Sequence, residues 1–359
     1  MSLAVVLFNL GGPDQASAVE PFLLNLFSDP AIIDLPGLLR RPLARLIAHR
    51  RAPVARAIYT KLGGGSPILE NTRVQAQALE AQLEACGTAA KVFVAMRYWH
   101  PFAAETARAV AALAPTRIVL LPLYPQYSTT TTASSLASWH DAASAAGLRC
   151  ETHAVCCYPA ERGFVLALAE LIREKLDRWS ERRPRLLFSA HGLPKKVIRR
   201  GDPYQWQAER TAAAVAAALA GAVEDWVVCY QSRVGPLEWI GPSTEEEIRR
   251  AGREHMPLMV VPIAFVSEHS ETLVELDIEY RHVADAAGVP GYLRVPTVSA
   301  HRLFIEGLAR LVEQALANPA PVQPDGGSRI CPAEFGRCAL SAPHPGAGKK
   351  KGGSLREPP

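Results

Sequence analysis

Near the middle of the chain an apolar run ends in a histidine; it reads Arg185-Leu186-Leu187-Phe188-Ser189-Ala190-His191-Gly192-Leu193-Pro194. Such a run is typical of a buried strand in a parallel sheet, and its histidine would leave the strand at the carboxyl end. Ligands of open α/β sheets bind just beyond these ends. A second run ends in Ser267-Glu268-His269-Ser270-Glu271-Thr272. We therefore predict that His191 and Glu271 share one polar site, suited to proton transfer or to a divalent metal.

Similar apolar runs alternate with helical stretches along the chain. The predicted strands include residues 1–8, 91–95, 117–121, 225–229 and 259–263. The predicted helices cover residues 71–84, 103–113, 162–178, 207–219 and 301–315. Continuous apolar strands between helices indicate parallel sheets that are covered on both faces. The fold class is therefore expected to be α/β, with doubly wound parallel sheets.

The two halves of the chain also repeat each other. Leu7-Phe8-Asn9-Leu10-Gly11-Gly12-Pro13 parallels residues 187–194 with one residue inserted before the proline, and Leu121-Pro122-Leu123 parallels Val261-Pro262-Ile263. This repetition predicts two similar domains that face each other across a ligand cleft. We place the first domain at residues 1–165 and the second, with His191 and Glu271, at 166–318. A C-terminal extension follows at 319–359, disordered from about residue 340.

Length and composition are those of an ordinary enzyme. The chain has 359 residues and 48% hydrophobic residues, enough for two cores. Its net charge of +4 is small and dispersed, which argues against a nucleic-acid partner. No secretion signal or membrane-spanning segment is recognised, and seven cysteines indicate reduced thiols rather than a disulfide framework. These features predict a cytoplasmic protein whose membrane contact, if any, is peripheral.

Residues 14–60 interrupt the first domain with an apolar and basic insertion. After the first strand a simple fold needs one helix, whereas this insertion holds an apolar stretch at 22–27 and an arginine-rich stretch at 38–57. The arginines alternate with leucines in a pattern that fits a helix lying on a membrane surface. An amphipathic helix packed on its own domain is the alternative. The arginines are Arg40, Arg41, Arg45, Arg50, Arg51 and Arg56.

A helix is predicted to start between Ser267 and Ser270, either of which could cap it. On this helix Glu271, Glu275 and Glu279 would lie on one face, where like charges need solvent or cations to compensate. The acidic stripe is therefore either a solvated face or a path for protons and metal ions. His191 has two interpretations as well, a structural histidine bonded to the backbone or a functional one; its place at a strand end favours function.

Two further loops are expected near the cleft. Gly63-Gly64-Gly65-Ser66-Pro67 lacks the lysine of a phosphate-binding loop, so it is interpreted as a turn that allows close ligand approach. The loop Tyr124-Pro125-Gln126-Tyr127-Ser128-Thr129-Thr130-Thr131-Thr132 follows a predicted strand. It would bring aromatic and hydroxyl groups, including those of Tyr124 and Ser128, to the same cleft; an ordinary capped loop is the alternative.

Taken in order and spacing, these segments resemble the ferrochelatase family from Asn9 to about Leu311. The resemblance rests on residues 9–13, 63–68, 124–128 and 189–194, on Met96-Arg97-Tyr98, on Gln231-Ser232-Arg233-Val234-Gly235-Pro236 and on residues 267–273. It implies two Rossmann-like domains with a porphyrin cleft between them. It also implies insertion of Fe²⁺ into protoporphyrin IX, with the insertion at 14–60 as the lip of the cleft.

The resemblance assigns roles that the chemistry of the residue types supports. His191 would take the pyrrole protons, Glu271 and Glu275 would relay protons or deliver metal, and His191 and Glu271 would contact Fe²⁺. Fe²⁺ is a substrate, and no cofactor is required for the chemistry. The residues expected to bind the porphyrin are Asn9, Gly11, Gly12, Pro13, Lys61, Arg97, Tyr98, Tyr124, Gln126, Ser128, Trp239 and His269, with Lys61, Arg97 or lip arginines on the propionates.

The resemblance does not decide whether the protein binds an iron–sulfur cluster. Some family members carry a [2Fe-2S] cluster on C-terminal cysteines, and Cys331 and Cys338 lie in that region. Four ligands are needed, so Cys156 or Cys157, with Cys150 as a further candidate, would complete the set. Thr129 stands where animal relatives carry a cysteine ligand. Free thiols are the alternative.

The chain also departs from the family at Ser299-Ala300-His301-Arg302, which lacks the asparagine-rich start expected for the last helix. Other functions compatible with the fold are a coproporphyrin chelatase, a cobalt chelatase, or a non-catalytic carrier of tetrapyrroles or metal. A carrier needs no proton acceptor, so the pairing of His191 with Glu271 argues against it.

Overall fold

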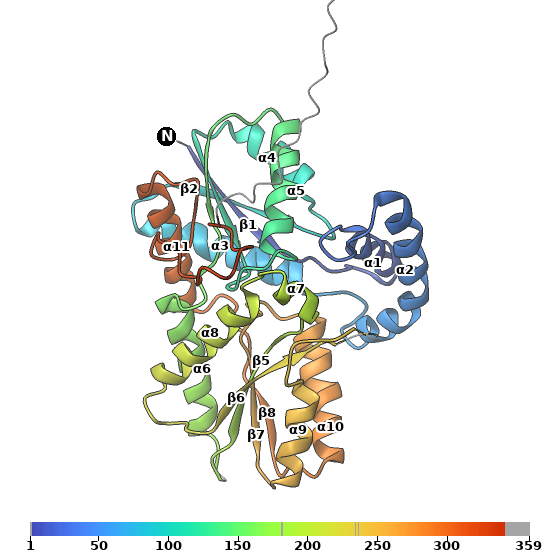
Figure 1. Ribbon diagram of the computed structural model, residues 1–359. Coiled ribbons are helices and arrows are strands. Elements are labelled where there is room, and N and C mark those ends of the chain that lie inside the picture. The colour runs from blue at the N-terminus through green and yellow to red at the C-terminus, as the bar shows by residue number, and fades with distance from the viewer. Residues whose placement is uncertain (1, 181, 234, 236, 342–359) are drawn as a thin grey trace, which may run out of the picture.

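Two parallel β-sheets form the frame of the molecule. The computed structural model describes residues 2–180, 182–233, 235 and 237–341 (Figure 1). The first sheet has the order β2-β1-β3-β4-β9 and the second the order β6-β5-β7-β8, and every pairing is parallel. The strands are β1 (Leu3–Asn9), β2 (Ala90–Met96), β3 (Arg117–Pro122), β4 (Glu151–Val155), β5 (Arg185–His191), β6 (Trp226–Gln231), β7 (Leu258–Pro262), β8 (Tyr292–Arg294) and β9 (Val322–Gln323).

Helices cover both sheets. They are α1 (Val19–Ser28), α2 (Gly37–Thr60), α3 (Ile68–Ala85), α4 (Ala103–Leu113), α5 (Thr132–Ala145), α6 (Arg162–Asp177), α7 (Lys195–Arg199), α8 (Tyr204–Ala218), α9 (Thr244–Arg253), α10 (Tyr280–Ala286) and α11 (Arg302–Ala317). A 3₁₀ turn, η1 (Ala16–Ala18), and a π-helix, η2 (Glu271–Glu279), complete the elements. The predicted α/β class with parallel sheets is confirmed.

The first four strands of each sheet share one order, because β2-β1-β3-β4 corresponds to β6-β5-β7-β8. In each case the first strand in sequence lies second in the sheet, so the β1 and β5 carboxyl ends, at Asn9 and His191, occupy equivalent positions. This matches the internal repeat seen in the sequence. The crevice beside such a strand is where doubly wound sheets bind ligands.

Three hydrophobic clusters follow from the alternation of side chains along the strands. Alternate residues of β1, namely Leu3, Val5 and Leu7, pack with α3, α6 and α11 in a core that continues to β5 and α8 of the second sheet. The other residues of β1 pack under α4 and α5. A third cluster lies between the second sheet and helices α9 and α10. The core therefore runs from one sheet to the other and fixes the carboxyl ends of β1 and β5 relative to each other.

The end of the described chain returns to the sheet that begins it. Helix α11 packs against α3 and α6, and β9 pairs with β4. The domain boundaries at 165 and 318 stay predictions. The tail predicted to be disordered from about residue 340 lies, apart from Leu340 and Ser341, outside the described residues.

The insertion at 14–60 forms an arm of two packed helices, α1 and α2, drawn in blue beside the sheets in Figure 1. On α2 the buried side is a stripe of small residues, Ala44, Ala48 and Ala52, of which Ala48 and Ala52 pack with α1. Larger apolar residues of α2 point outward, with Leu38 92% and Leu39 61% exposed. We call this arm the lip.

Helix η2 differs from the helix expected between Ser267 and Tyr280. It begins at Glu271 without a side-chain cap, because the Ser267 hydroxyl donates to Gln75 Oε1 at 2.8 Å instead. The predicted cap by Ser267 was therefore wrong, whereas Ser270 stands at the N-cap position but its side chain makes no capping bond. The backbone N–H of Tyr280 bonds the carbonyl of Glu275, the i to i−5 pattern of a π-helix. Such helices are rare and often mark functional sites.

Candidate active site

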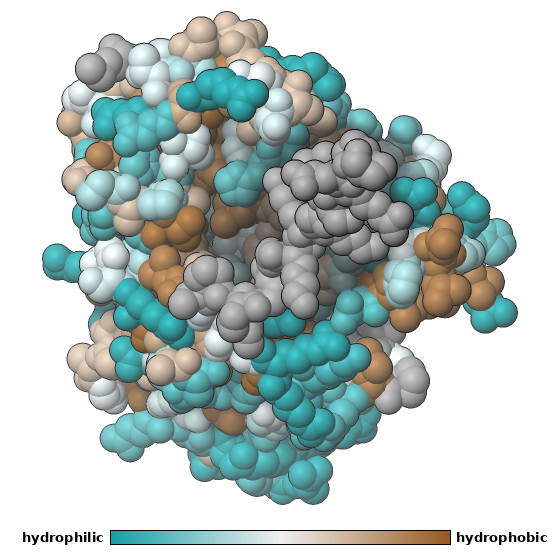
Figure 2. All heavy atoms as spheres, turned by 45° about the horizontal axis from the view of Figure 1, so that its top comes forward, coloured by the Kyte–Doolittle hydropathy of each residue, from teal (hydrophilic) through white to brown (hydrophobic). Residues whose placement is uncertain are grey.

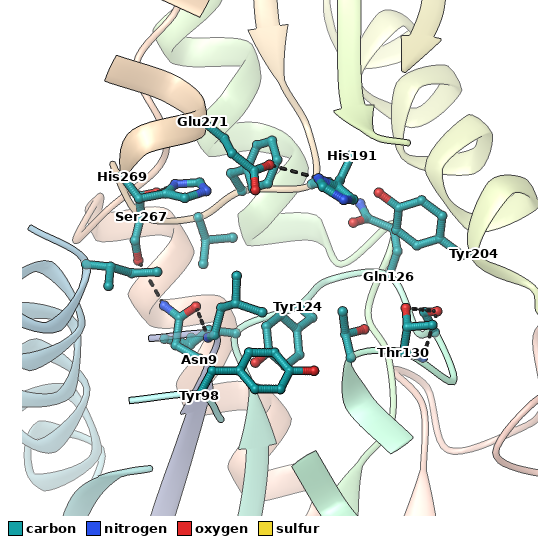
Figure 3. Close-up of a pocket in the computed structure, with 18 of the residues that line it drawn as sticks. Asn9, Tyr98, Tyr124, Gln126, Thr130, His191, Tyr204, Ser267, His269 and Glu271 are labelled. Carbon is teal, nitrogen blue, oxygen red and sulfur yellow. Dashed lines mark hydrogen bonds and ion pairs between the residues drawn. The ribbon is translucent and has the colours of Figure 1, made fainter. Parts of the chain in front are cut away.

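A cavity opens between the two domains at the carboxyl ends of β1, β3, β5 and β7. It encloses about 970 Å³ of space, open mouth included. Its walls are mainly apolar, with contributions from Leu26 and Ile32 of the lip region. In Figure 3, Glu271 and His191 face each other on one side, and Asn9, Tyr98 and Tyr124 lie on the other. The cleft expected from the repeat is therefore present.

His191 and Glu271 form an ion pair at this cavity. His191 ends β5, Glu271 begins η2, and Nδ1 of His191 lies 2.8 Å from Oε2 of Glu271. Both side chains are partly buried, 38% and 24% exposed respectively. Because Glu271 accepts at Nδ1, the other ring nitrogen, Nε2, is the atom left to exchange a proton with a ligand.

The pair sets the charge of both groups. Burial alone would lower the pKa of His191, but the charge and hydrogen bond of Glu271, with a smaller effect of Glu275, raise it above 6.5. Burial alone would raise the pKa of Glu271, but His191, His269 and Ser232 lower it to about 2. At neutral pH Glu271 is therefore an anion that stabilises a positive charge on the imidazole.

Glu275 lies one turn further along η2, outside the residues that line the cavity. It accepts hydrogen bonds from Gln231 Nε2 at 2.9 Å, from the N–H and hydroxyl of Ser232 at 2.8 and 2.5 Å, and from Tyr280 at 3.0 Å. Burial and the charge of Glu271 nevertheless raise its pKa. The Ser232 hydroxyl also donates to Glu271 at 3.2 Å, so the two carboxylates share one donor and can exchange protons through it.

Several predicted residues join the domains across the cavity floor. Asn9 Nδ2 donates to the Ser267 hydroxyl at 3.4 Å, and Gln126 Nε2 donates to the carbonyl of Ile263 at 3.0 Å. The Ser128 hydroxyl donates to the buried Asp202 at 3.0 Å. Asn9, Gln126 and Ser128 line the cavity, yet these bonds also hold the two domains together. His269 lines the cavity as well, with its Nδ1 3.0 Å from the carbonyl of Ser267.

The aromatic wall of the cavity is tied to the lip through Asp29. This buried carboxylate accepts hydrogen bonds from Arg97 at 2.7 Å, Tyr98 at 2.8 Å and Ser134 at 2.5 Å. Tyr98 and Tyr124 line the cavity, whereas Arg97 lies outside the lining residues with its guanidinium on Asp29. A role of Arg97 on a propionate stays a prediction and would require competition with Asp29.

Five other predicted residues also lie outside the cavity lining. Gly11 has a φ of +82°, and a Cβ on Gly12 would lie 2.6 Å from Ser66, so both glycines serve a tight turn. The Pro13 carbonyl accepts from Ser66 at 2.7 Å. Lys61 pairs with Glu279 at 3.5 Å, and the Trp239 indole N–H is buried without a partner in the described structure.

Sequence reasoning missed two aromatic residues of the site. The Phe265 ring packs edge-on against His269 at 4.8 Å and against His191 at 6.5 Å between ring centroids. Tyr204 starts α8, lines the cavity and has a buried hydroxyl with no partner among the described residues. Phe265 lies two residues before the polar run at 267–272 and could have been found from that position. Tyr204 carries no such signal.

Four cysteines gather beside the first domain, away from the cavity. Cys156 and Cys157 have sulfurs 3.8 Å apart, and the free thiols of Cys331 and Cys338 are hydrogen-bonded to each other. The Gln207 amide joins the pairs, because Nε2 donates to Cys157 at 3.4 Å and to Cys331 at 3.1 Å. Cys150 lies elsewhere, because it precedes the amino end of β4 whereas Cys156 and Cys157 follow its carboxyl end. Within the described residues no group of three or more His, Cys, Asp or Glu is arranged to hold a metal ion.

Solved structures share this fold. SirB from Bacillus subtilis with Fe³⁺ superposes with a TM-score of 0.52 and 12% identity, over 89% of this chain and 97% of that one. The sirohydrochlorin chelatase SirB from Bacillus subtilis subspecies spizizenii in complex with cobalt gives a TM-score of 0.52 and 11% identity, with 89% and 97% covered. Identities this low show the fold alone.

Sequence comparisons reach further. The ferrochelatase family model matches residues 2–316. A ferrochelatase from Caulobacter vibrioides (strain NA1000 / CB15N) is 56% identical over 94% of this chain and 96% of its own length. One from Phenylobacterium zucineum is 55% identical over 94% and 98%, and one from Pelagibacter ubique is 49% identical over 87% and 91%. Because the family model covers residues 2–316 and these relatives are about half identical over most of their length, the chain belongs to the ferrochelatase family.

Proposed function

We propose that this enzyme inserts Fe²⁺ into protoporphyrin IX to form protohaem, with release of two protons. The observation that carries the proposal is the His191–Glu271 pair at the end of an apolar cavity, since metal insertion must remove two pyrrole protons from an apolar macrocycle. Relatives that are 46–56% identical are named ferrochelatase, which agrees with this reaction.

In the proposed reaction His191 takes protons at Nε2 while Glu271 holds its Nδ1. The imidazolium that forms is stabilised by the carboxylate beside it. Protons can then pass to Glu271 and, through the shared Ser232 hydroxyl, to Glu275. Few and weak metal ligands suit this task, because a site that bound iron tightly could not release it to the porphyrin.

The apolar walls bind the porphyrin and exclude water. Tyr98 and Tyr124 present aromatic surface to one side of the cavity, opposite the ion pair. Holding the macrocycle between these surfaces would bend it, which points its nitrogen lone pairs toward the incoming metal. The energy for this distortion comes from binding contacts away from the reacting atoms.

Anaerobic turnover tests the proposal directly. Purified protein would be supplied with Fe²⁺ and either protoporphyrin IX or coproporphyrin, with Co²⁺ in parallel, and product followed by its visible bands. Haem from protoporphyrin at the higher kcat/KM supports the proposal. A preference for coproporphyrin or for Co²⁺ identifies a related chelatase instead. Tight tetrapyrrole binding without turnover of either porphyrin identifies a carrier and rejects enzymatic function.

We also propose that the enzyme is cytoplasmic and that the lip rests on a membrane surface. Among the described residues no helix is long and apolar enough to cross a bilayer. Figure 2 shows hydrophobic surface gathered on the arm at its right-hand edge, where α2 exposes Leu38, Leu39, Leu46 and Val54 beside arginines. Exposed leucines among arginines suit the interface of an anionic membrane. The seven free thiols agree with a reducing compartment.

Replacing Leu38 and Leu39 by glutamate is expected to weaken vesicle binding by about tenfold or more for each leucine, because each loses roughly 1.5–3 kcal/mol of burial. Co-sedimentation with vesicles that contain anionic lipid measures the effect. The matched control is Leu113→Glu, which changes an exposed leucine on α4, far from the lip in sequence. If the lip variants, the Leu113→Glu control and the unaltered protein bound vesicles equally well, the lip would not be the membrane-binding surface.

We further propose a [2Fe-2S] cluster on Cys156, Cys157, Cys331 and Cys338. The four buried thiols equal in number the ligands that such a cluster requires and lie in two pairs that Gln207 joins, but in the described structure they are not arranged around a metal, so cluster binding would require them to rearrange. The hydrogen bond from Cys331 lowers the pKa of Cys338 to about 6 despite partial burial, so one thiolate is available at neutral pH. When bound, the cluster would supply a one-electron redox centre. The cysteines would then tie the C-terminal extension to the first domain.

Protein purified without oxygen is expected to show visible absorption bands with two irons and two sulfides per chain. Cys331→Ser should remove the bands and the bound iron, because one of four ligands is lost. Cys150→Ser should retain them, since Cys150 lies at the amino end of β4, away from Cys156 and Cys157 at its carboxyl end. A colourless, iron-free unaltered protein after reconstitution would show that the four cysteines are plain thiols.

A further inference from the structure

A buried arginine connects the π-helix to the second sheet. Arg294 ends β8 and its side chain is only 9% exposed. Its Nε and Nη2 donate to the two oxygens of Asp277 at 2.7 Å each, and its Nη1 donates to Glu268 Oε1 at 2.9 Å. Glu268 precedes η2 and Asp277 lies in its second half, so one guanidinium holds the helix from both sides of Glu271 and Glu275.

The π-helix needs such external support. Its wide i to i−5 ring leaves backbone groups poorly paired, and two of its carbonyls accept side-chain donors from neighbouring strands. Tyr292 donates to the carbonyl of Leu276 at 2.7 Å, and Gln231 donates to that of Glu271 at 3.0 Å. Side chains of β8 and β6 therefore stabilise the π-helix through hydrogen bonds to its carbonyls.

The π register decides where the acidic side chains point. An α-helix advances by roughly 100° per residue, so removing the extra residue from one turn rotates the following side chains by about that angle. Asp277 would then turn away from Arg294, and Glu275 would turn away from Ser232. The bidentate contact opposes this rotation, because a planar guanidinium fits a carboxylate in one orientation.

We propose that Arg294 is a positioning residue for metal insertion, which holds the π register so that Glu271 meets His191 and Glu275 meets Ser232. The proposal rests on the proposed function and deepens it. Arg294 touches neither the cavity lining nor the reacting atoms, and acts through Glu268 and Asp277. Its absence would leave two partly buried carboxylates near each other without their cation.

The test compares Arg294→Met and the milder Arg294→Lys with a matched control, Arg281→Met. Arg281 also lies beside β8, where it donates to the Tyr292 carbonyl at 3.1 Å and stacks on that ring, but it holds neither carboxylate. We expect kcat/KM for Fe²⁺ to fall about 10- to 100-fold in Arg294→Met and less in Arg294→Lys. The Kd for porphyrin, measured by fluorescence quenching, should stay within twofold. The control should stay within threefold on both measures.

A double-mutant cycle separates positioning from simple loss of folded protein. In a Glu271→Gln background, Arg294→Met should cost at most about threefold, because the group it positions is already altered. The proposal would be overturned if Arg294→Met lowered kcat/KM by the same factor with and without Glu271→Gln, and if the number of porphyrin-binding sites fell by that factor as well. Amide hydrogen exchange gives a readout that needs no turnover: residues 272–279 should exchange at least tenfold faster in Arg294→Met while β5 and β7 stay protected. Unchanged exchange of residues 272–279 overturns the proposal even if the unaltered enzyme makes haem. Faster exchange there supports the role of Arg294 in holding η2 even if the unaltered enzyme makes no haem.

Discussion

His191→Ala is expected to lower kcat for iron insertion by about 10²- to 10⁴-fold, the usual contribution of a positioned general base. The variant loses the Nε2 that accepts pyrrole protons, while the apolar walls that bind porphyrin remain. Stopped-time haem assays under anaerobic conditions give kcat, and fluorescence quenching gives the Kd for porphyrin. The loss should fall on kcat, with the porphyrin Kd changed by less than about fivefold.

His301→Ala is the matched control. His301 is also partly buried beside a glutamate, with Nε2 3.4 Å from Glu170, but it lies before α11 and away from the cavity lining. Its replacement should leave kcat within twofold. Full activity of His191→Ala at neutral pH would assign proton removal to another group, and His269 would be the first to examine because it lines the same cavity.

Glu271→Gln is expected to lower kcat about 10²-fold and to move the acidic limb of the pH profile to lower pH. The limb follows His191, which must be neutral to accept a proton. Burial lowers the pKa of His191, and the charge of Glu271 is the main influence that raises it above 6.5. Without that charge only the weaker effect of Glu275 opposes burial, so the pKa falls. Profiles of kcat from pH 5 to 9, in both enzymes, measure the shift.

An acidic limb that stays in place, or moves to higher pH, would show that His191 is not the group that titrates. The pair also makes a signed contribution to stability. The lowered pKa of Glu271 stabilises the fold above pH 4.5 and loses this effect as the pH falls toward about 2. The raised pKa of His191 stabilises it below pH 6.5 and loses this effect as the pH rises past the folded value. Glu271→Gln should therefore lower the free energy of unfolding most between about pH 4.5 and pH 6.5, where both effects are present.

The sequence predicted the frame and the central pair because both depend on local pattern. Apolar runs ending at His191 and before Ser267 identify strands whose carboxyl ends meet at one edge of a sheet, so the proximity of His191 to Glu271 follows from the fold class. The helix predicted at 103–113 matches α4 at both ends. These features need no knowledge of long-range contacts.

The π-helix was not predictable in the same way. Its spacing of Glu271, Glu275 and Glu279 fits an α-helix equally well, and the choice of register depends on donors from distant strands. The position of Arg97 on Asp29 depends on the lip folding back over the domain, a contact 68 residues apart in sequence. Tyr204 enters the cavity only because α8 packs against α6 and β6. Tertiary contacts, which pattern does not encode, decided all three.

The pairing of β9 with β4 has a consequence for synthesis. Ala154 and its partner Val322 are 168 residues apart, so the first sheet lacks its edge strand until nearly the whole chain has been made. At roughly 5–20 residues per second, the ribosome needs about 8–34 s to cover that distance. During this time β4 has an open edge and α6 lacks its partner α11. A nascent N-terminal half is therefore an unfinished domain, which exposes the edge of β4 and the side of α6 that α11 later covers.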